Sequence, residues 1–156
     1  AVMTRWLNDS EMRAWRGYIE SIAHLMGAFE DDLVDHGLTM GDYEVLAYLS
    51  EAPEQKMRMC DLADALRLTA SGLTRRLDGL VRMGAVSREA SSSDRRVMFA
   101  TLTDAGRDSL LRAAPDHLES VRRHFIDLLT TEQVQAMGDA FDTLRTHLRQ
   151  RVPVDG

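Results

Sequence analysis

The first third of the chain alternates apolar and polar positions with the spacing of an α-helix. Seven apolar residues recur at intervals of three and four and fall on one helical face: Met12, Trp15, Ile19, Ile22, Met26, Phe29 and Leu33. Gly37 ends this predicted helix, because glycine readily adopts the left-handed conformation that follows many helix C-termini. A second helix is predicted from about residue 40 to residue 50, with Tyr43 and Leu46 facing inward.

The last third of the chain repeats this helical spacing, in one run over residues 111–128 and another over residues 134–148. Pro115 predicts a kink in the first run rather than a break, and Thr130-Thr131 predicts the start of the second. The tail from Val152 onward is predicted to be frayed. Because long apolar faces need partners along their whole length, we expect the terminal helices of two chains to interlock in a homodimer. An intramolecular helical bundle is the alternative.

The middle of the chain has the pattern of a helix-turn-helix. A short helix over residues 60–67 precedes a tight turn at residues 68–69. A second helix then runs from residue 70 to about residue 83, and Thr69 is its expected N-cap. The inward face of this second helix carries Leu73, Leu77 and Leu80.

The outward face of the second helix combines hydroxyl side chains with arginines. It carries Ser71, Thr74, Arg75 and Arg82, and Arg76 and Asp78 lie nearer its flanks. Small residues let a helix approach the major groove closely, and arginine can donate two hydrogen bonds to guanine. An ordinary solvated helix face has a similar composition, so these residues alone leave both interpretations open.

Two short strands are predicted directly after this helix. Residues 85–90 and 96–102 alternate in character and are joined by a polar tip over residues 91–95. A two-stranded ribbon in this position is a wing, whose Arg95 and Arg96 can reach an adjacent minor groove. Asp94 is expected to orient a neighbouring arginine or to cap the turn, and Thr103 is the predicted N-cap of the next long helix.

Asp94, Arg96, Leu102-Thr103 and Gly106 have the spacing of a known wing signature. With the helix-turn-helix and both helical flanks, the chain resembles the MarR family of bacterial transcriptional regulators over essentially its whole length. The resemblance implies a mainly α fold with a small β wing. A winged helix-turn-helix over residues 37–103 is then flanked by long N- and C-terminal dimerisation helices over residues 1–36 and 104–152, in one intertwined domain.

The resemblance also implies a function. A homodimer would bind a pseudo-palindromic double-stranded DNA operator and usually repress nearby genes, and many members release DNA when they sense a phenolic or aromatic acid, or an oxidant. The expected DNA-binding residues are Thr69, Ser71, Thr74, Arg75, Arg76, Arg82, Asp94, Arg95 and Arg96. Gly79 stands where relatives often have a basic residue. The alternative function is a dimeric helical module that binds ligand or protein but not DNA.

A net charge of -6 by itself argues against nucleic-acid binding, but the distribution of charge along the chain changes this interpretation. The balance is -8 over residues 1–54, +4 over residues 55–100 and -2 over residues 101–156. The predicted DNA-binding region is therefore a basic segment between acidic flanks, and 18 of the 19 basic residues are arginine.

Composition and the absence of certain motifs argue against a membrane protein and against an enzyme. The apolar runs are too short for a membrane span, and a single cysteine cannot form an intramolecular disulfide, so we expect a cytoplasmic protein without a membrane partner. The sequence contains neither a phosphate-binding glycine loop nor a Gly-x-Ser-x-Gly motif, so we expect no enzyme and no cofactor.

The sequence contains candidate residues for three further kinds of site: a ligand site, a redox site and a metal site. By family resemblance, a small aromatic ligand would lie between the terminal helices and the winged region, against Trp15, Arg16, Tyr18, Tyr43, Tyr48 and His117; the alternative is that Trp15 and Tyr43 belong to the core. Cys60 is a candidate redox sensor, or a buried substitute for the serine cap of its helix. His117 and His124 are about 10 Å apart along one helix, too far to share a metal, so no metal site is predicted.

Overall fold

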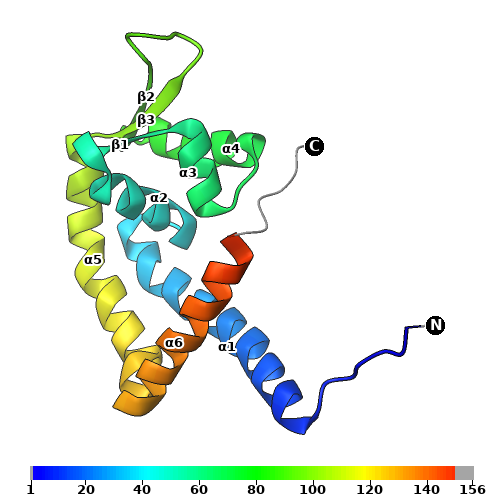
Figure 1. Ribbon diagram of the computed structural model, residues 1–156. Coiled ribbons are helices and arrows are strands. Elements are labelled where there is room, and N and C mark those ends of the chain that lie inside the picture. The colour runs from blue at the N-terminus through cyan, green and yellow to red at the C-terminus, as the bar shows by residue number, and fades with distance from the viewer. Residues whose placement is uncertain (1, 150–156) are drawn as a thin grey trace.

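The computed structural model describes residues 2–149 and consists of six α-helices and a small sheet (Figure 1). The elements are α1 (Asp9–Leu33), α2 (Met40–Glu51), β1 (Lys56–Arg58), α3 (Met59–Leu66), α4 (Ala70–Arg82), β2 (Val86–Ala90), β3 (Met98–Leu102), α5 (Asp104–His124) and α6 (Thr131–Arg149). Short 3₁₀ turns occupy Val34–His36, Pro53–Gln55 and Ile126–Leu128. The mainly α fold with a β wing is as predicted, whereas the Val152 tail lies outside the described residues.

Polar caps set the ends of the helices close to their predicted positions. The Thr39 hydroxyl accepts a hydrogen bond from the Asp42 N–H, and the Asp42 carboxylate accepts one from the Thr39 N–H. This reciprocal pair caps the N-terminus of α2. Thr130 and Gln133 make the same reciprocal pair before α6. Gly37 follows α1 with φ of 68°. Pro115 does not break α5, which continues to His124.

The sheet has three strands, not the two predicted. Its order is β1-β3-β2 with both pairs antiparallel, and Lys56 pairs with Thr101 while Val86 pairs with Leu102. Sequence reasoning missed β1 because three residues are too few for an alternating pattern to be recognised. β1 forms only because β3 offers it a partner edge.

The hydrophobic core lies within the helix-turn-helix and its supports. Leu46, Leu62, Leu73, Leu77 and Leu80 are fully buried between α2, α3, α4 and the sheet. They include the inward face predicted for the second helix of the motif. This core holds α4 rigidly, because a helix is stabilised mainly by packing of its apolar face.

A close approach at Gly106 joins the wing to α5. A Cβ at this position would overlap the carbonyl oxygen of Ala85, which precedes β2. The Thr103 hydroxyl donates to the Gly84 carbonyl at 2.6 Å and accepts from the Gly106 N–H at 3.0 Å. The start of α5 is thus fixed against the base of the wing.

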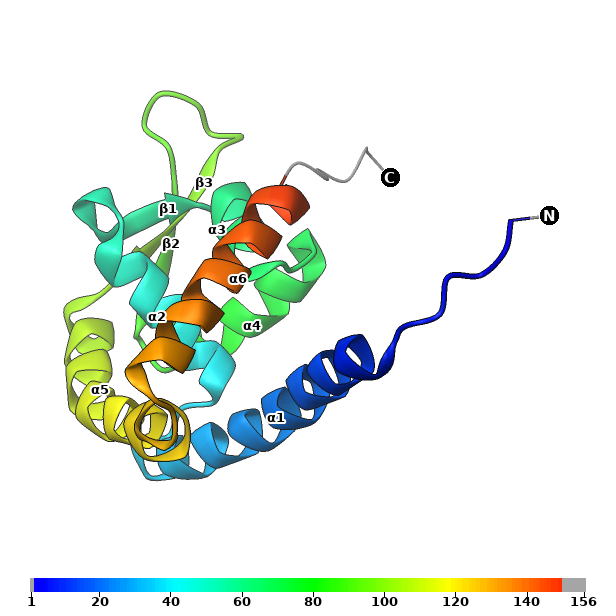
Figure 2. The same ribbon diagram turned by 60° about the horizontal axis from the view of Figure 1, so that its bottom comes forward.

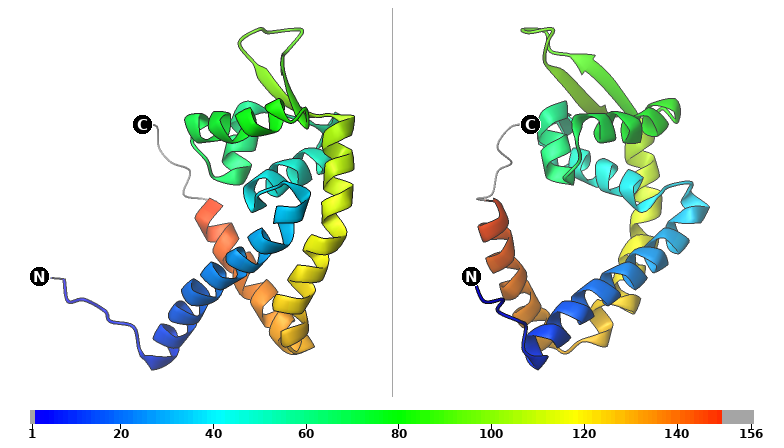
Figure 3. Two further views of the ribbon diagram at one scale, coloured as in Figure 1. Left: turned by 180° about the vertical axis from the view of Figure 1, so that it is seen from behind. Right: turned by 90° about the vertical axis from the view of Figure 1, so that its right-hand side faces the viewer.

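The terminal helices leave much of their apolar surface exposed. The N-terminal half of α1 extends away from the winged region, as Figures 2 and 3 show. Large apolar side chains remain exposed on α1 and α6, namely Trp15, Tyr18, Ile19, Ile22, Met26, Phe141, Leu144 and Leu148. Trp15 is therefore not a core residue in the single chain. Between residues 2 and 149, no helix is long and apolar enough to cross a membrane.

Candidate nucleic-acid interface

Helix α4 lies next to the projecting wing (Figures 1 and 3), and its exposed face is polar. The Thr69 hydroxyl accepts a 3.0 Å hydrogen bond from the Gly72 N–H and caps the helix as predicted. Ser71, Thr74, Arg75 and Arg82 are all exposed. The Thr74 hydroxyl donates to the Ala70 carbonyl at 3.0 Å, so its methyl and oxygen have a defined orientation. This face has the small N-terminal residues and arginines that suit a major groove.

Arg76 lies apart from that exposed face. Its side chain is half-buried and packs against Gly41 near the start of α2, where a Cβ would overlap its guanidinium group. In the single chain Arg76 thus links α4 to α2. Among the predicted DNA-binding residues on α4, it is the one that packs inward.

The wing tip is organised by Asp94 and Arg96. Arg96 Nε and Nη2 donate to the two carboxylate oxygens of Asp94, each at 3.2 Å, and the Arg96 N–H donates to Oδ1 at 3.0 Å. These hydrogen bonds, first those from the Arg96 side chain, hold the pKa of Asp94 below its ordinary value. Asp94 both orients its neighbour and caps the turn, as predicted, while the side chain of Arg96 is 91% exposed. Arg95 is also exposed.

Arg88 also lies at this surface, although it was not among the residues predicted from the sequence to bind DNA. Arg88 on β2 contacts α4 through Asp78, at 2.5 Å between Arg88 Nη2 and Asp78 Oδ1, and through the Thr74 carbonyl at 3.2 Å. The only available signal was an arginine in a predicted strand beside a helix carrying an aspartate. Nothing in the spacing of ten residues indicates that the two side chains meet.

Known proteins with the same arrangement identify the family. The MarR family model matches residues 38–98. The transcriptional repressor YetL of Bacillus subtilis is 31% identical over 111 residues, which cover 69% of this chain and 66% of YetL. The crystal structure of AbsC, a MarR family transcriptional regulator from Streptomyces coelicolor, is similar at a TM-score of 0.90 and 43% identity, over 95% of this chain and 100% of AbsC. The chain belongs to the MarR family.

A second structure with the same fold contains DNA. Sco3205, a MarR family transcriptional regulator from Streptomyces coelicolor solved in complex with DNA, is 35% identical, with a TM-score of 0.90 over 97% of each chain. As a member of the MarR family, this chain is a DNA-binding transcriptional regulator and not an enzyme.

The aromatic residues proposed for a ligand do not line one site in this MarR chain. Tyr43 and His117 are buried, with ring centroids 4.4 Å apart, and Phe29 meets His117 edge-on at 5.3 Å. Burial raises the pKa of Tyr43, and burial lowers the pKa of His117 against a smaller opposing effect of Asp32. Within residues 2–149, His117 Nδ1 has no hydrogen-bond partner.

The other members of that set lie elsewhere. Trp15 and Tyr18 are exposed on α1, and Tyr18 lies 6.4 Å from the Phe141 ring on α6. Arg16 is exposed on α1. Tyr48 lines a separate hollow of about 700 Å³ formed with β1 and β3. Tyr43 is thus a core residue, and only His117 joins it from the predicted ligand set.

Cys60 is not a buried cap of its helix. It is exposed and lies inside α3, where its thiol donates weakly to Asp61 at 3.8 Å. Arg58 occupies the N-cap position, and no side chain caps this helix. A role of Cys60 in redox sensing stays a prediction.

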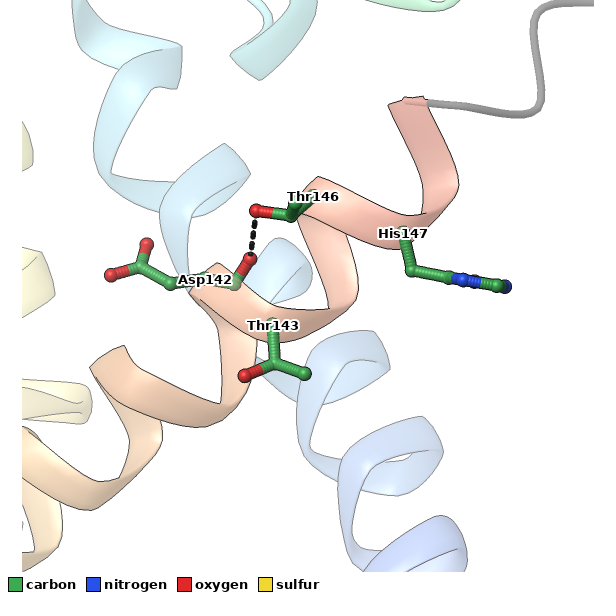
Figure 4. A pocket seen from close by; sticks show the side chains of 4 residues that line it. All are labelled: Asp142, Thr143, Thr146 and His147. Atoms are coloured by element: carbon green, nitrogen blue, oxygen red, sulfur yellow. Dashed lines mark hydrogen bonds between the residues drawn. The ribbon is translucent and has the colours of Figure 1, made fainter.

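Another hollow lies along α6. It measures about 480 Å³ and is lined by Asp142, Thr143, Thr146 and His147 of α6. These side chains point in different directions, and the Thr146 hydroxyl donates to the Asp142 carbonyl (Figure 4). In the part of the chain that the structure describes, no three histidine, cysteine or acidic side chains are placed to hold a metal ion.

Proposed function

We propose that the chain binds a pseudo-palindromic operator as a homodimer, in sequence-specific fashion, and represses transcription. The observation that carries this proposal is the polar face of α4 beside a wing whose Arg96 is exposed and oriented by Asp94. One α4 per subunit would enter successive major grooves about 34–36 Å apart, with the wings over the flanking minor grooves. Repression is the named activity of the relative YetL.

The exposed apolar faces of α1 and α6 support the homodimer. On α1, Ile22 is 41% and Met26 is 37% exposed, and on α6, Leu144 is 53% and Leu148 is 55% exposed. Each of these apolar side chains would stabilise a folded dimer by leaving water, and a second copy offers a matching face. The arrangement of the terminal helices therefore favours interlocked subunits.

We also propose that a small aromatic acid releases the operator. The support for this proposal is the junction of α1, α2 and α5, where the His117 ring contacts both Phe29 and Tyr43 and His117 Nδ1 is buried without a hydrogen-bond partner among residues 2–149. An aromatic carboxylate has the polar atoms to satisfy such groups. This junction, rather than exposed Trp15 or Tyr48, is where we expect the ligand.

Selection of duplexes from a random pool tests the operator proposal. Enrichment of one inverted repeat is the expected result, and loss of its binding on adding an aromatic acid would support release. In vitro transcription from the selected site then separates repression from activation. If no duplex is enriched, the proposal of sequence-specific operator binding is wrong.

A further inference from the structure

Arg88 connects the wing to the helix that faces DNA. Its Nη2 donates both to the Asp78 carboxylate at 2.5 Å and to the Thr74 carbonyl at 3.2 Å. Thr74 and Asp78 lie four residues apart, so the guanidinium group forms hydrogen bonds with two successive turns of α4. Since Arg88 belongs to β2, this contact fixes the angle at which the ribbon leaves the helix.

Asp78 occupies a position where a free carboxylate is unfavourable. It follows Ser71, Thr74 and Arg75 at helical spacing and is exposed, so it lies on or beside the face proposed to meet DNA. An unpaired negative charge there repels phosphate groups. The bond from Arg88 neutralises this charge and turns the carboxylate toward the wing.

The side chain of Arg88 is partly buried. Its side chain is only 30% exposed, and its Nε is buried without a partner among the described residues. An exposed arginine could satisfy all its donors with water, so this placement carries a desolvation cost. Packing against α4 and the charge-assisted bond to Asp78 offset that cost.

We propose that Arg88 is a positioning residue, which holds the wing at a fixed angle to α4 and neutralises Asp78, so that wing and helix bind one duplex as a rigid unit. The proposal rests on the operator binding proposed above. The alternative role for Asp78 is to accept a hydrogen bond from a cytosine amino group, which would make it a base-reading residue.

Four single variants and one double variant separate these roles. Arg88→Met removes the bond and the charge, Arg88→Lys keeps the charge but loses the planar fork, and Asp78→Asn removes the carboxylate. Arg112→Met is the matched control, because Arg112 is an exposed arginine on α5 away from the wing. Each is measured for affinity to the selected operator, for the preferred sequence in a new selection, and for protection of the minor groove from hydroxyl radicals.

We expect Arg88→Met to weaken operator binding roughly 10- to 100-fold and to abolish protection at the wing, with the preferred bases unchanged. The operator affinity of Arg88→Lys should lie between that of Arg88→Met and that of the wild type. Arg112→Met should bind the operator with the affinity of the wild type. Adding Asp78→Asn to Arg88→Met should restore part of the affinity, because the uncompensated carboxylate is then gone. Asp78→Asn alone should leave the preferred bases unchanged.

A measurement on the free protein tests the contact between the wing and α4 without any DNA. Amide hydrogen exchange in β2 and β3 should become faster in Arg88→Met and stay unchanged in Arg112→Met. If the wild type selects no duplex, operator binding fails while this exchange result still tests the connection. Unchanged wing protection and exchange in Arg88→Met, or a new preferred base in Asp78→Asn, would overturn the positioning role.

Discussion

Arg96 and Asp94 form a two-pronged ion pair at the tip of the wing, with two side-chain hydrogen bonds of 3.2 Å. The pair orders an arginine that is otherwise surrounded by solvent. A guanidinium group held in one orientation loses less entropy when it enters a minor groove. The pair therefore orients Arg96 in advance for the minor-groove contact proposed above.

Arg96→Ala should weaken binding to the selected operator about tenfold without changing which sequence is preferred. The reason is that a minor-groove arginine interacts mainly with the local negative potential. Titration at several salt concentrations is the measurement, and the slope of log K against log salt should become shallower. A changed base preference in a repeated selection would contradict this role.

Arg75→Ala should reduce operator affinity by about 1–3 kcal/mol and relax recognition at one position of each half-site. Arg75 is exposed on α4 and can donate two hydrogen bonds to a guanine. Affinities for the operator and for random DNA are measured side by side. Equal losses on both duplexes would show that Arg75 contacts phosphate instead.

Leu144→Asp and Ile22→Asp should convert the dimer into monomers, since each places a charge within the exposed apolar faces of α6 and α1. Sedimentation gives the mass, and operator affinity should fall with it. Met98→Asp is the control for the mass alone, because Met98 is an exposed apolar residue outside α1 and α6, on the wing, where an added charge also opposes DNA binding. A dimer that survives both of the first two substitutions would rule out these faces as the interface.

His117 makes folding stability depend on pH. Burial holds its pKa below the ordinary value, so between that lowered value and about 6.5 the unfolded chain binds a proton that the folded chain does not. The free energy of unfolding should therefore fall as the pH drops below about 7. Chemical denaturation at a series of pH values measures the slope, which His117→Phe should reduce.

Two glycines should respond to alanine in opposite directions. Gly106→Ala should destabilise the fold by roughly 1–3 kcal/mol, because the new Cβ overlaps the Ala85 carbonyl oxygen. Gly79→Ala should stabilise it by up to about 1 kcal/mol, because nothing lies within 4 Å of that position and alanine is the better helix former. Thermal unfolding of the free protein compares the two. A neutral Gly106→Ala would show that α5 can shift away from the wing.

Local patterns predicted most of the fold. Apolar spacing of three and four located the long helices, and capping threonines such as Thr69 and Thr103 marked where helices begin. Predictions were weaker where a residue's environment comes from a distant part of the chain. Cys60 is exposed rather than buried, and β1 was missed, because burial and strand pairing depend on neighbours far away in sequence.

The sequence by itself determined the helix-turn-helix, the polar face of α4 and the order of the wing residues, because each depends on periodicity or on hydrogen bonds that span a few residues. Only the tertiary structure decided that Arg76 packs on Gly41, that Arg88 reaches Asp78 and that His117 lies between Phe29 and Tyr43. These contacts join residues on different elements. Their geometry follows from how the common core packs the elements together, which no local pattern records.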